Sequence, residues 1–248
     1  MIDLTGRVAL VTGAAGGIGA GITAAFLEAG ATVVAAWHTR PPADPPTGGA
    51  SDDRWLAVAA DLTAPDGPDR LVSAAVSRFG RLDALVNNAA RQDLEPLASM
   101  TDDQFRAMLE TNLVAVHRLT QRAVPELART DGSVVTIASI EAATPAPAHA
   151  HYAVSKAAVV MQARAAALEH GPLGVRVNTV SPGLIDRPGL AVDWPEGVER
   201  WQRAAPLGRL GTPADIGAAC VFLSSPLAAW ITGTDLTVDG GVSVHPHW

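Results

Sequence analysis

The sequence contains a single cysteine, Cys220, in 248 residues. One cysteine excludes an intramolecular disulfide, and its apolar neighbours favour a small core residue. No stretch approaches the ~18 consecutive apolar residues of a membrane span. The first residues also lack the charged region and apolar segment of a secretory signal. We therefore expect a cytoplasmic protein with no membrane partner.

Aromatic residues are also scarce, at 4% of the chain, whereas 48% of residues are hydrophobic. The core must therefore be built from alanine, valine, leucine and isoleucine. A basic excess is absent, since the net charge is −7 and the pI is near 5.4, which argues against nucleic acid as a partner. The histidines and carboxylates do not fall at metal-ligand spacing, so no metal is expected. The length suits one doubly wound or barrel domain.

Tyrosine and lysine occur once each, as Tyr152 and Lys156. The other basic residues counted with Lys156 are all arginine. Positions four apart share a helix face, so a phenol and an ammonium are expected to project together. A nearby ammonium stabilises the phenolate, which predicts a lowered pKa for Tyr152 and proton exchange with a substrate oxygen. The alternative is a partly exposed tyrosine beside a solvated lysine.

A glycine-rich turn follows the first apolar run. Residues 7–12 predict a buried strand, residues 20–29 predict a helix ended by Gly30, and Gly13-Ala-Ala-Gly-Gly-Ile-Gly19 lies between them. Such a turn lets the backbone approach a pyrophosphate at a helix N-terminus. The spacing fits Gly-x-x-x-Gly-x-Gly and Gly-x-x-Gly-x-x-Gly equally well, and an ordinary tight turn is the alternative.

The second predicted strand, residues 31–36, ends without the acidic residue that binds the ribose hydroxyls of NAD. His38 and Arg40 follow instead, and a basic pair suits a ribose 2′-phosphate, so NADP is favoured. In the alternative, Arg40 is a solvated loop residue. The Pro- and Gly-rich residues 41–53 predict a surface loop.

Strands and helices alternate along the rest of the chain. A third strand, residues 55–60, is closed by Asp61-Leu62, and a fourth, residues 82–86, by Asn87-Asn-Ala-Ala90. The further elements predicted are helices over 65–79 and from Thr101 through Asn112 towards Leu127, strands over 132–138, 175–180 and 236–241, a helix carrying Tyr152, a short helix over 196–204, and a helix starting at Thr212. This order predicts an α/β fold: a single doubly wound Rossmann domain over 1–248, with a parallel sheet of about seven strands.

From about Leu4 to Val242, the chain resembles the short-chain dehydrogenase/reductases in their shorter single-domain branch, similar to 3-oxoacyl-ACP reductase-like ketoreductases. The residues that carry the resemblance are Thr12-Gly13, Gly17-Ile18-Gly19, Asp61-Leu62, Asn87-Asn88-Ala89, Asn112, Ser139, Tyr152, Lys156, Pro182-Gly183 and Val238-Asp-Gly-Gly241. The resemblance favours the Gly13, Gly17 and Gly19 spacing. Extended relatives with the other spacing need a longer C-terminal substrate domain.

The resemblance implies hydride transfer between a nicotinamide and a carbonyl or carbinol carbon. Tyr152 is then the general acid in reduction, and Lys156 lowers its pKa and holds the nicotinamide ribose. Ser139 donates a hydrogen bond to the carbonyl oxygen, and Asn112 helps hold a proton-relaying water. These four are the implied catalytic residues.

The resemblance also implies a set of cofactor-binding residues, with NADP(H) favoured and NAD(H) possible. Besides Tyr152 and Lys156 the set comprises Gly13, Gly17, Ile18, Gly19, His38, Arg40, Asp61, Leu62, Asn88, Ala89, Ala90, Pro182, Gly183 and Ile185. Three positions depart from the family pattern. Ala90 replaces a usual glycine, Gly16 lies where NADP users often have a basic residue, and Arg187 replaces a usual threonine near the carboxamide.

Substrate contacts are expected from residues 140–151 and from a substrate-lid segment at about 184–209. The candidates are Glu141, His149, His151, Trp194 and Trp201. The leading hypothesis is an NADP(H)-dependent ketoreductase of a bulky, aromatic or polyketide-like ketone. The alternatives are an NAD-dependent dehydrogenase of a sugar, cyclitol or steroid alcohol, and a catalytically silent dinucleotide sensor. By analogy with the family, we expect a homo-oligomer, either a tetramer or a dimer.

Overall fold

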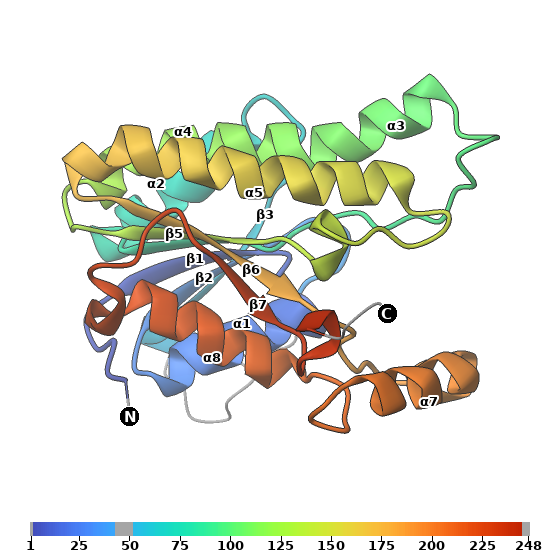
Figure 1. The fold of residues 1–248 in the computed structure, drawn as a ribbon. Coiled ribbons are helices and arrows are strands. Elements are labelled where there is room, and N and C mark those ends of the chain that lie inside the picture. Colours follow the sequence, from blue (N-terminus) through green and yellow to red (C-terminus); the bar gives the residue numbers. More distant parts are fainter. Residues whose placement is uncertain (1, 43–51, 245–248) are drawn as a thin grey trace.

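The computed structural model describes residues 2–42 and 52–244. Seven parallel strands form one sheet in the order β3-β2-β1-β4-β5-β6-β7 (Figure 1). The strands are β1 Val8–Thr12, β2 Thr32–Trp37, β3 Trp55–Ala59, β4 Ala84–Asn87, β5 Ser133–Ile137, β6 Arg176–Pro182 and β7 Asp235–Val238. The predicted α/β class and the doubly wound parallel sheet are confirmed.

Helices cover both faces of the sheet. The α-helices are α1 Gly17–Glu28, α2 Gly67–Phe79, α3 Asp102–Leu109, α4 Ala115–Leu127, α5 Ala150–His170, α6 Leu190–Asp193, α7 Pro195–Ala204 and α8 Pro213–Ser224. Shorter helical turns are η1 Asp52–Arg54, η2 Glu110–Val114, η3 Ile140–Ala142, η4 Gly171–Leu173, η5 Pro226–Ala228 and η6 Val242–Val244. In Figure 1, α1 and α8 lie below the sheet, and α2, α4 and α5 lie above it.

Two apolar clusters explain this layering. The strands β1 and β5 are buried at every position, as expected for parallel strands covered on both faces. One cluster joins the sheet to α1 and α8 through residues such as Ile22, Phe26 and Ile216. The other joins it to α2, α4 and α5 through residues such as Leu71 and Leu119. Cys220 is fully buried in the first cluster.

The strand order reverses between β1 and β4. The chain moves from β1 outward through β2 to β3, then returns to the other side of β1 at β4 and continues to β7. Ligands of doubly wound sheets bind at the carboxyl ends of the strands that flank this switch point. Thr12 and Asn87, at the ends of β1 and β4, are therefore at the expected place for a binding site.

The structure departs from the predicted elements in three places. The first helix begins at Gly17, inside the glycine-rich turn, rather than at residue 20. The long helix predicted over residues 101–127 is interrupted by one π-helical turn, η2, between α3 and α4. The predicted lid contains the short α6 in addition to α7. Within residues 2–42 and 52–244, no helix is long and apolar enough to cross a membrane.

Candidate active site

The glycine-rich turn is shaped by three glycines. Gly13 and Gly17 have φ of +64° and +52°, a conformation that L side chains rarely adopt. A Cβ on Gly19 would lie 2.0 Å from the carbonyl oxygen of Gly13. Gly16 differs, because its φ is −178° and an added Cβ would meet only Arg40 Nη2, at 3.6 Å. The glycines that this backbone requires are thus Gly13, Gly17 and Gly19. Ile18 lies beside them, half-buried, in the first turn of α1.

The end of β4 is joined to the same turn by hydrogen bonds. The Asn88 amide donates to the carbonyl oxygens of Thr12 and Gly13, at 2.9 and 3.2 Å. The backbone N–H groups of Asn88 and Ala89 donate to the Thr12 hydroxyl, at 3.0 and 3.1 Å. The sequence indicated Thr12 only as part of a motif. In the structure, its hydroxyl connects the carboxyl end of β1 to the residues that follow β4, at the switch point.

A cavity of about 390 Å³ opens at the carboxyl ends of β1 to β4. Six of the predicted cofactor residues line it, namely Gly13, His38, Asp61, Leu62, Ala89 and Ala90, whereas Arg40 does not. The other lining residues are Thr12, Ala36, Trp37, Thr39, Ala60, Thr63, Arg91 and Thr111. The Asp61 carboxylate accepts hydrogen bonds from the hydroxyl and backbone of Thr63, which lower its pKa. His38 Nε2 lies 3.9 Å from Asp61 Oδ2.

Tyr152 and Lys156 lie on the first two turns of α5, on the side that packs on the sheet. Both are buried, with exposed fractions of 7% and 4%. Lys156 Nζ lies 5.4 Å from the centroid of the Tyr152 ring, and it donates a hydrogen bond to the carbonyl oxygen of Ile137 at 2.8 Å. The predicted common face is therefore observed, and the ammonium lies over the ring.

The predicted lowering of the Tyr152 pKa is wrong for the protein without bound nucleotide, because the pKa is raised. Burial raises the pKa of Tyr152 to about 12, the Ser139 hydroxyl works in the opposite direction, and the Glu141 carboxylate raises the pKa further. Burial lowers the pKa of Lys156 to about 8. The sequence argument counted the attraction of the ammonium but not the loss of water around both groups, and here the loss of water dominates.

Asn112 lies in the π-helical turn η2 and is buried. Its amide donates to Ser155 Oγ at 3.0 Å, to the carbonyl oxygen of Arg91 at 2.9 Å and to Met108 Sδ at 3.1 Å, while its Oδ1 accepts from Arg91 N–H at 2.8 Å. Ser155 Oγ in turn donates to the carbonyl oxygen of Tyr152 at 2.7 Å. The extra residue of a π turn rotates Asn112 towards α5, a placement that helical periodicity does not predict.

Ser139 follows β5, and its hydroxyl caps the turn η3 by accepting the backbone N–H of Glu141 at 3.1 Å. Within η3, Glu141 Oε2 lies 2.8 Å from His149 Nδ1. The His149 ring meets the Tyr152 ring edge-on, with centroids 5.8 Å apart and planes at 66°. His151 is 1% exposed, and within the described residues its Nδ1 has no hydrogen-bond partner.

Pro182 ends β6, and Gly183 follows it close to the lid. A Cβ on Gly183 would lie 2.8 Å from the Trp201 ring and 2.9 Å from Asp239 Cβ. Ile185 forms an isolated bridge with Gly211. Arg187, which replaces the threonine usual in the family, is half exposed, and its Nη1 lies 2.8 Å from Asp193 Oδ2. The guanidinium of Arg187 is thus held by a residue of α6.

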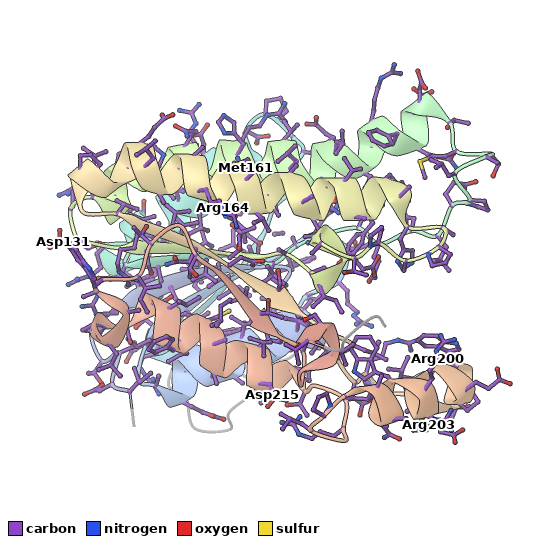
Figure 2. The ribbon with its side chains drawn as sticks, viewed as in Figure 1. Asp131, Met161, Arg164, Arg200, Arg203 and Asp215 are labelled. Carbon is purple, nitrogen blue, oxygen red and sulfur yellow. The ribbon has the colours of Figure 1, made fainter. Side chains whose placement is uncertain are left out.

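Helix α7, within the segment predicted as a lid, projects from one end of the sheet and carries Arg200 and Arg203 on its surface (Figure 2). Arg200 lies over the Trp194 ring, 5.7 Å from its centroid, and Trp194 is 44% exposed. Trp201, the second predicted tryptophan contact, is half-buried and packs against the cluster of Leu190, Val198 and Leu210. Only Trp201 therefore turns towards Gly183.

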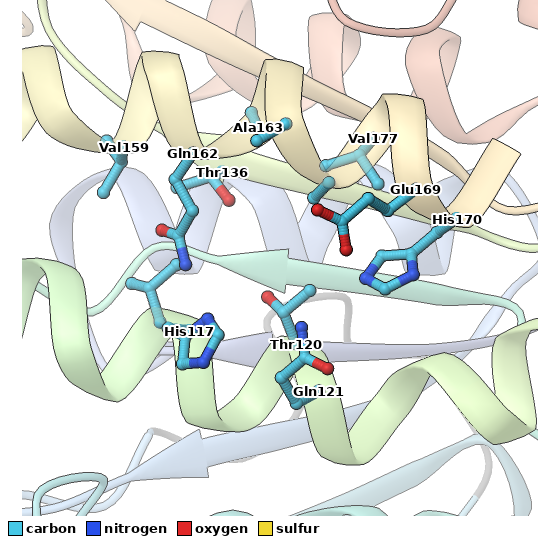
Figure 3. Close-up of a pocket in the computed structure, with 13 residues that line it drawn as sticks. His117, Thr120, Gln121, Thr136, Val159, Gln162, Ala163, Glu169, His170 and Val177 are labelled. Carbon is cyan, nitrogen blue, oxygen red and sulfur yellow. The ribbon is translucent and has the colours of Figure 1, made fainter.

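A second cavity, of about 130 Å³, lies between α4 and α5 (Figure 3). His117 and Gln121 of α4 face Gln162, Glu169 and His170 of α5 across it. None of the predicted catalytic residues lines this cavity. In the part of the chain that the structure describes, no group of three or more His, Cys, Asp or Glu residues could hold a metal ion.

Known proteins resemble this chain along most of its length. Residues 13–243 match the profile of the family described as Enoyl-(Acyl carrier protein) reductase. L-fucose dehydrogenase of Oryctolagus cuniculus is 39% identical over 250 residues, covering 96% of this chain and 86% of that protein. 3beta-hydroxysteroid dehydrogenase 1 of Eggerthella lenta is 33% identical over 255 residues, covering 98% of this chain and 96% of that protein.

Solved structures are similar along the whole chain. A short-chain dehydrogenase/reductase named glucose/ribitol dehydrogenase, from Brucella melitensis, has a TM-score of 0.89 at 34% identity, covering 97% of this chain and 98% of that one. The ligand-free aldohexose dehydrogenase of Thermoplasma acidophilum has a TM-score of 0.87 at 30% identity, covering 100% and 96%. The chain belongs to the short-chain dehydrogenase/reductase family. It is an NAD(P)-dependent oxidoreductase that acts on CH–OH and C=O groups, within a family whose members act on alcohols and sugars.

The residues present fit a dinucleotide. At Gly17, where the turn enters α1, a Cβ would meet nothing within 4 Å, so the backbone there is open to close approach. The start of α1 contributes backbone N–H groups without a capping side chain, an arrangement suited to a pyrophosphate.

Proposed function

We propose that this protein transfers a hydride between NADP(H) and a secondary alcohol or its ketone. The observation that carries the choice of NADP(H) is the position of Arg40. Its Nη2 lies 3.6 Å from the place of a Cβ on Gly16, so the guanidinium reaches the glycine-rich turn from the end of β2. Trp37, not an acid, ends β2. A cation here favours a ribose 2′-phosphate.

The bound nicotinamide supplies the hydride chemistry, and the side chains supply orientation and proton transfer. Ser139 donates a hydrogen bond to the reacting oxygen, which stabilises charge that develops there. Tyr152 exchanges a proton with the same oxygen. Lys156, fixed by the carbonyl oxygen of Ile137, holds the nicotinamide ribose and favours the phenolate. Asn112, through Ser155, fixes the α5 backbone at Tyr152 and helps hold the proton-relaying water.

For the substrate, we propose a sugar, a cyclitol or another ring alcohol. The named relatives include L-fucose and aldohexose dehydrogenases, and the paired Glu141 and His149 place polar groups beside Tyr152. A bulky, aromatic or polyketide-like ketone is the second candidate, favoured by Trp201 beside Gly183. The silent-sensor hypothesis has no support, because the family identifies an enzyme and all four expected catalytic residues are present.

The test is turnover of sugars and cyclitols with NADP+ and NAD+, and of ring ketones with NADPH and NADH, with Tyr152→Phe as the inactive control. Arg40→Ser should lower the NADPH to NADH ratio of kcat/KM by about 10- to 100-fold, the value of one charged hydrogen-bonded contact. Arg129→Ser is the matched control, because Arg129 is an exposed arginine that pairs with Glu126 and does not line the cavity. An unchanged ratio in Arg40→Ser, or a wild-type preference for NADH, would refute the choice of NADP(H).

We also propose a cytoplasmic homo-oligomer, a dimer or tetramer. Val154, Met161 and Leu168 lie seven residues apart along α5 and are 48%, 60% and 80% exposed. A spacing of seven places them on one helix face, a stripe of apolar groups open to water. Figure 2 shows Met161 on this helix. Light scattering coupled to size-exclusion chromatography tests the assembly, and Met161→Glu should shift it towards the monomer.

A further inference from the structure

Two ionisable side chains beside Tyr152 have no role in the reaction as described above. Glu141 Oε2 and His149 Nδ1 lie 2.8 Å apart, and their side chains are only 16% and 15% exposed. Both were candidates for substrate contact, but nothing in the sequence indicated that they would pair. A largely buried polar pair has to be held by the fold, and two features hold this one.

The first feature is the turn η3, in which the backbone N–H of Glu141 is fixed by Ser139 Oγ at 3.1 Å. The second is the backbone before His149. Ala148 has φ of +61°, the left-handed region that is rare for a residue with a side chain. Its carbonyl oxygen accepts the backbone N–H of Glu95 at 2.9 Å. Strain of this kind persists where surrounding contacts impose it, and it is concentrated at functional sites.

The pair and Lys156 lie on opposite sides of Tyr152 along α5. His149, Tyr152 and Lys156 are spaced by three and four residues, so His149 and Lys156 flank Tyr152 from opposite directions along α5. Lys156 occupies the side next to β5, where it reaches the carbonyl oxygen of Ile137. His149 packs edge-on against the Tyr152 ring. The Glu141 carboxylate is close enough to raise the pKa of Tyr152.

Each member of the pair keeps one atom free. Among the residues that the structure describes, Glu141 Oε1 and His149 Nε2 have no hydrogen-bond partner. A carboxylate oxygen only accepts hydrogen bonds, and the second imidazole nitrogen accepts in the neutral ring and donates in the charged ring. An apolar substrate group placed here would displace water from the Glu141 carboxylate and leave that oxygen without a hydrogen bond. A hydroxyl group would instead donate a hydrogen bond to the carboxylate in place of the water.

We propose that Glu141 and His149 bind the hydroxyl group on the carbon next to the reacting carbinol, which makes a vicinal diol on a ring the preferred substrate. Ser139 and Tyr152 hold the reacting oxygen, and the neighbouring oxygen of a diol is separated from it by only three bonds. A pair fixed beside Tyr152 reaches that second oxygen. This inference deepens the proposed function and rests on it.

The test compares cyclohexanol with cis- and trans-1,2-cyclohexanediol, using whichever nucleotide gives the higher turnover. The measured quantity is the ratio of kcat/KM for the better diol to kcat/KM for cyclohexanol. We expect a wild-type ratio of at least about 10, and a fall of about tenfold in Glu141→Gln and in His149→Phe, equivalent to about 1.4 kcal/mol. Phenylalanine keeps the ring contact with Tyr152 while removing both nitrogens.

Glu126→Gln is the matched control, because Glu126 lies in the last turn of α4 and pairs with Arg129, whereas Tyr152 lies in the first turn of α5. Any change in the Tyr152 pKa affects both alcohols alike and cancels in the ratio. A wild-type ratio near one, or equal ratios in wild type and both variants, would overturn the proposal. A preference for NADH would refute the cofactor assignment alone and leave this ratio measurable.

Should neither alcohol be turned over, the same comparison is made by binding. The rise in Tm of the Tyr152→Phe protein with NADP+ is then measured at equal concentrations of diol and cyclohexanol. We expect the larger rise with a diol, and loss of that difference when Glu141→Gln is added. Equal rises for the two alcohols would overturn the proposal.

Discussion

Exchanging Gly19 for alanine should damage the nucleotide site, whereas the same change at Gly16 should leave it largely intact. The added Cβ at Gly19 would lie 2.0 Å from the carbonyl oxygen of Gly13 and 2.7 Å from Asn88 Nδ2. The backbone atoms it meets cannot turn aside as a flexible side chain can. At Gly16 the nearest atom is Arg40 Nη2, at 3.6 Å, and φ is extended.

The expected change in the free energy of unfolding for Gly19→Ala follows from two opposing effects. Overpacking against the backbone costs about 3 kcal/mol, and alanine is favoured over glycine within a helix by about 1 kcal/mol. The net loss of about 2 kcal/mol corresponds to a fall in Tm of about 4–8 °C for a chain of this length. Gly16→Ala, at the N-cap of α1, should change the free energy of unfolding by no more than about 1 kcal/mol.

Nucleotide binding gives the second measurement. Because Gly13 lines the cavity and its oxygen must move, we expect Gly19→Ala to weaken NADPH binding by at least about tenfold, or about 1.4 kcal/mol. Trp37 lines the same cavity, so quenching of tryptophan fluorescence reports the Kd. Wild-type Tm and Kd in Gly19→Ala would refute the reasoning, and so would a larger effect of Gly16→Ala.

Three further predictions concern stability. Burial lowers the pKa of Lys156 from 10.5 to about 8. Between these two pH values the unfolded chain binds more protons than the folded chain, so the contribution of Lys156 to the free energy of unfolding rises with pH. Lys156→Met should therefore raise the Tm at pH 7, and this gain in Tm should shrink as the pH approaches 10. Asn112→Leu leaves the backbone N–H and carbonyl of Arg91 without their partner and should cost about 2 kcal/mol, seen as a Tm lower by about 4–8 °C in thermal circular dichroism. The Asp215 carboxylate caps α8 and pairs with Arg209, which holds the pKa of Asp215 well below its usual range. Asp215→Asn should lower the free energy of unfolding by about 1 kcal/mol at pH 7. The difference in free energy of unfolding between this variant and the wild type should narrow as the pH falls below about 4.

Much of the fold was predictable from the sequence because parallel strands buried on both faces appear as short apolar runs. The runs at residues 7–12 and 55–60 became β1 and β3 within one residue at each end. The break in the helix predicted over 101–127 was not predictable, since one added residue leaves no mark on the apolar pattern.

The catalytic side chains were predictable by type and spacing, but their energetics were not. The spacing of Tyr152 and Lys156 set their common helix face, whereas the pKa of each depends on how deeply the folded chain buries it. The partnership of Glu141 with His149 depends on the φ of Ala148, and alanine in a sequence gives no indication of a left-handed conformation.

Because the chain has one lysine, acylating reagents can modify only one side-chain amine. Lys156 is the one lysine in 248 residues, and its pKa of about 8 leaves a neutral, nucleophilic fraction at mildly alkaline pH. Acylation there blocks the only tryptic cut between Arg129 and Arg164, so one undivided peptide records the modification. The yield of that peptide measures how open the catalytic side of α5 is, without substrate or turnover.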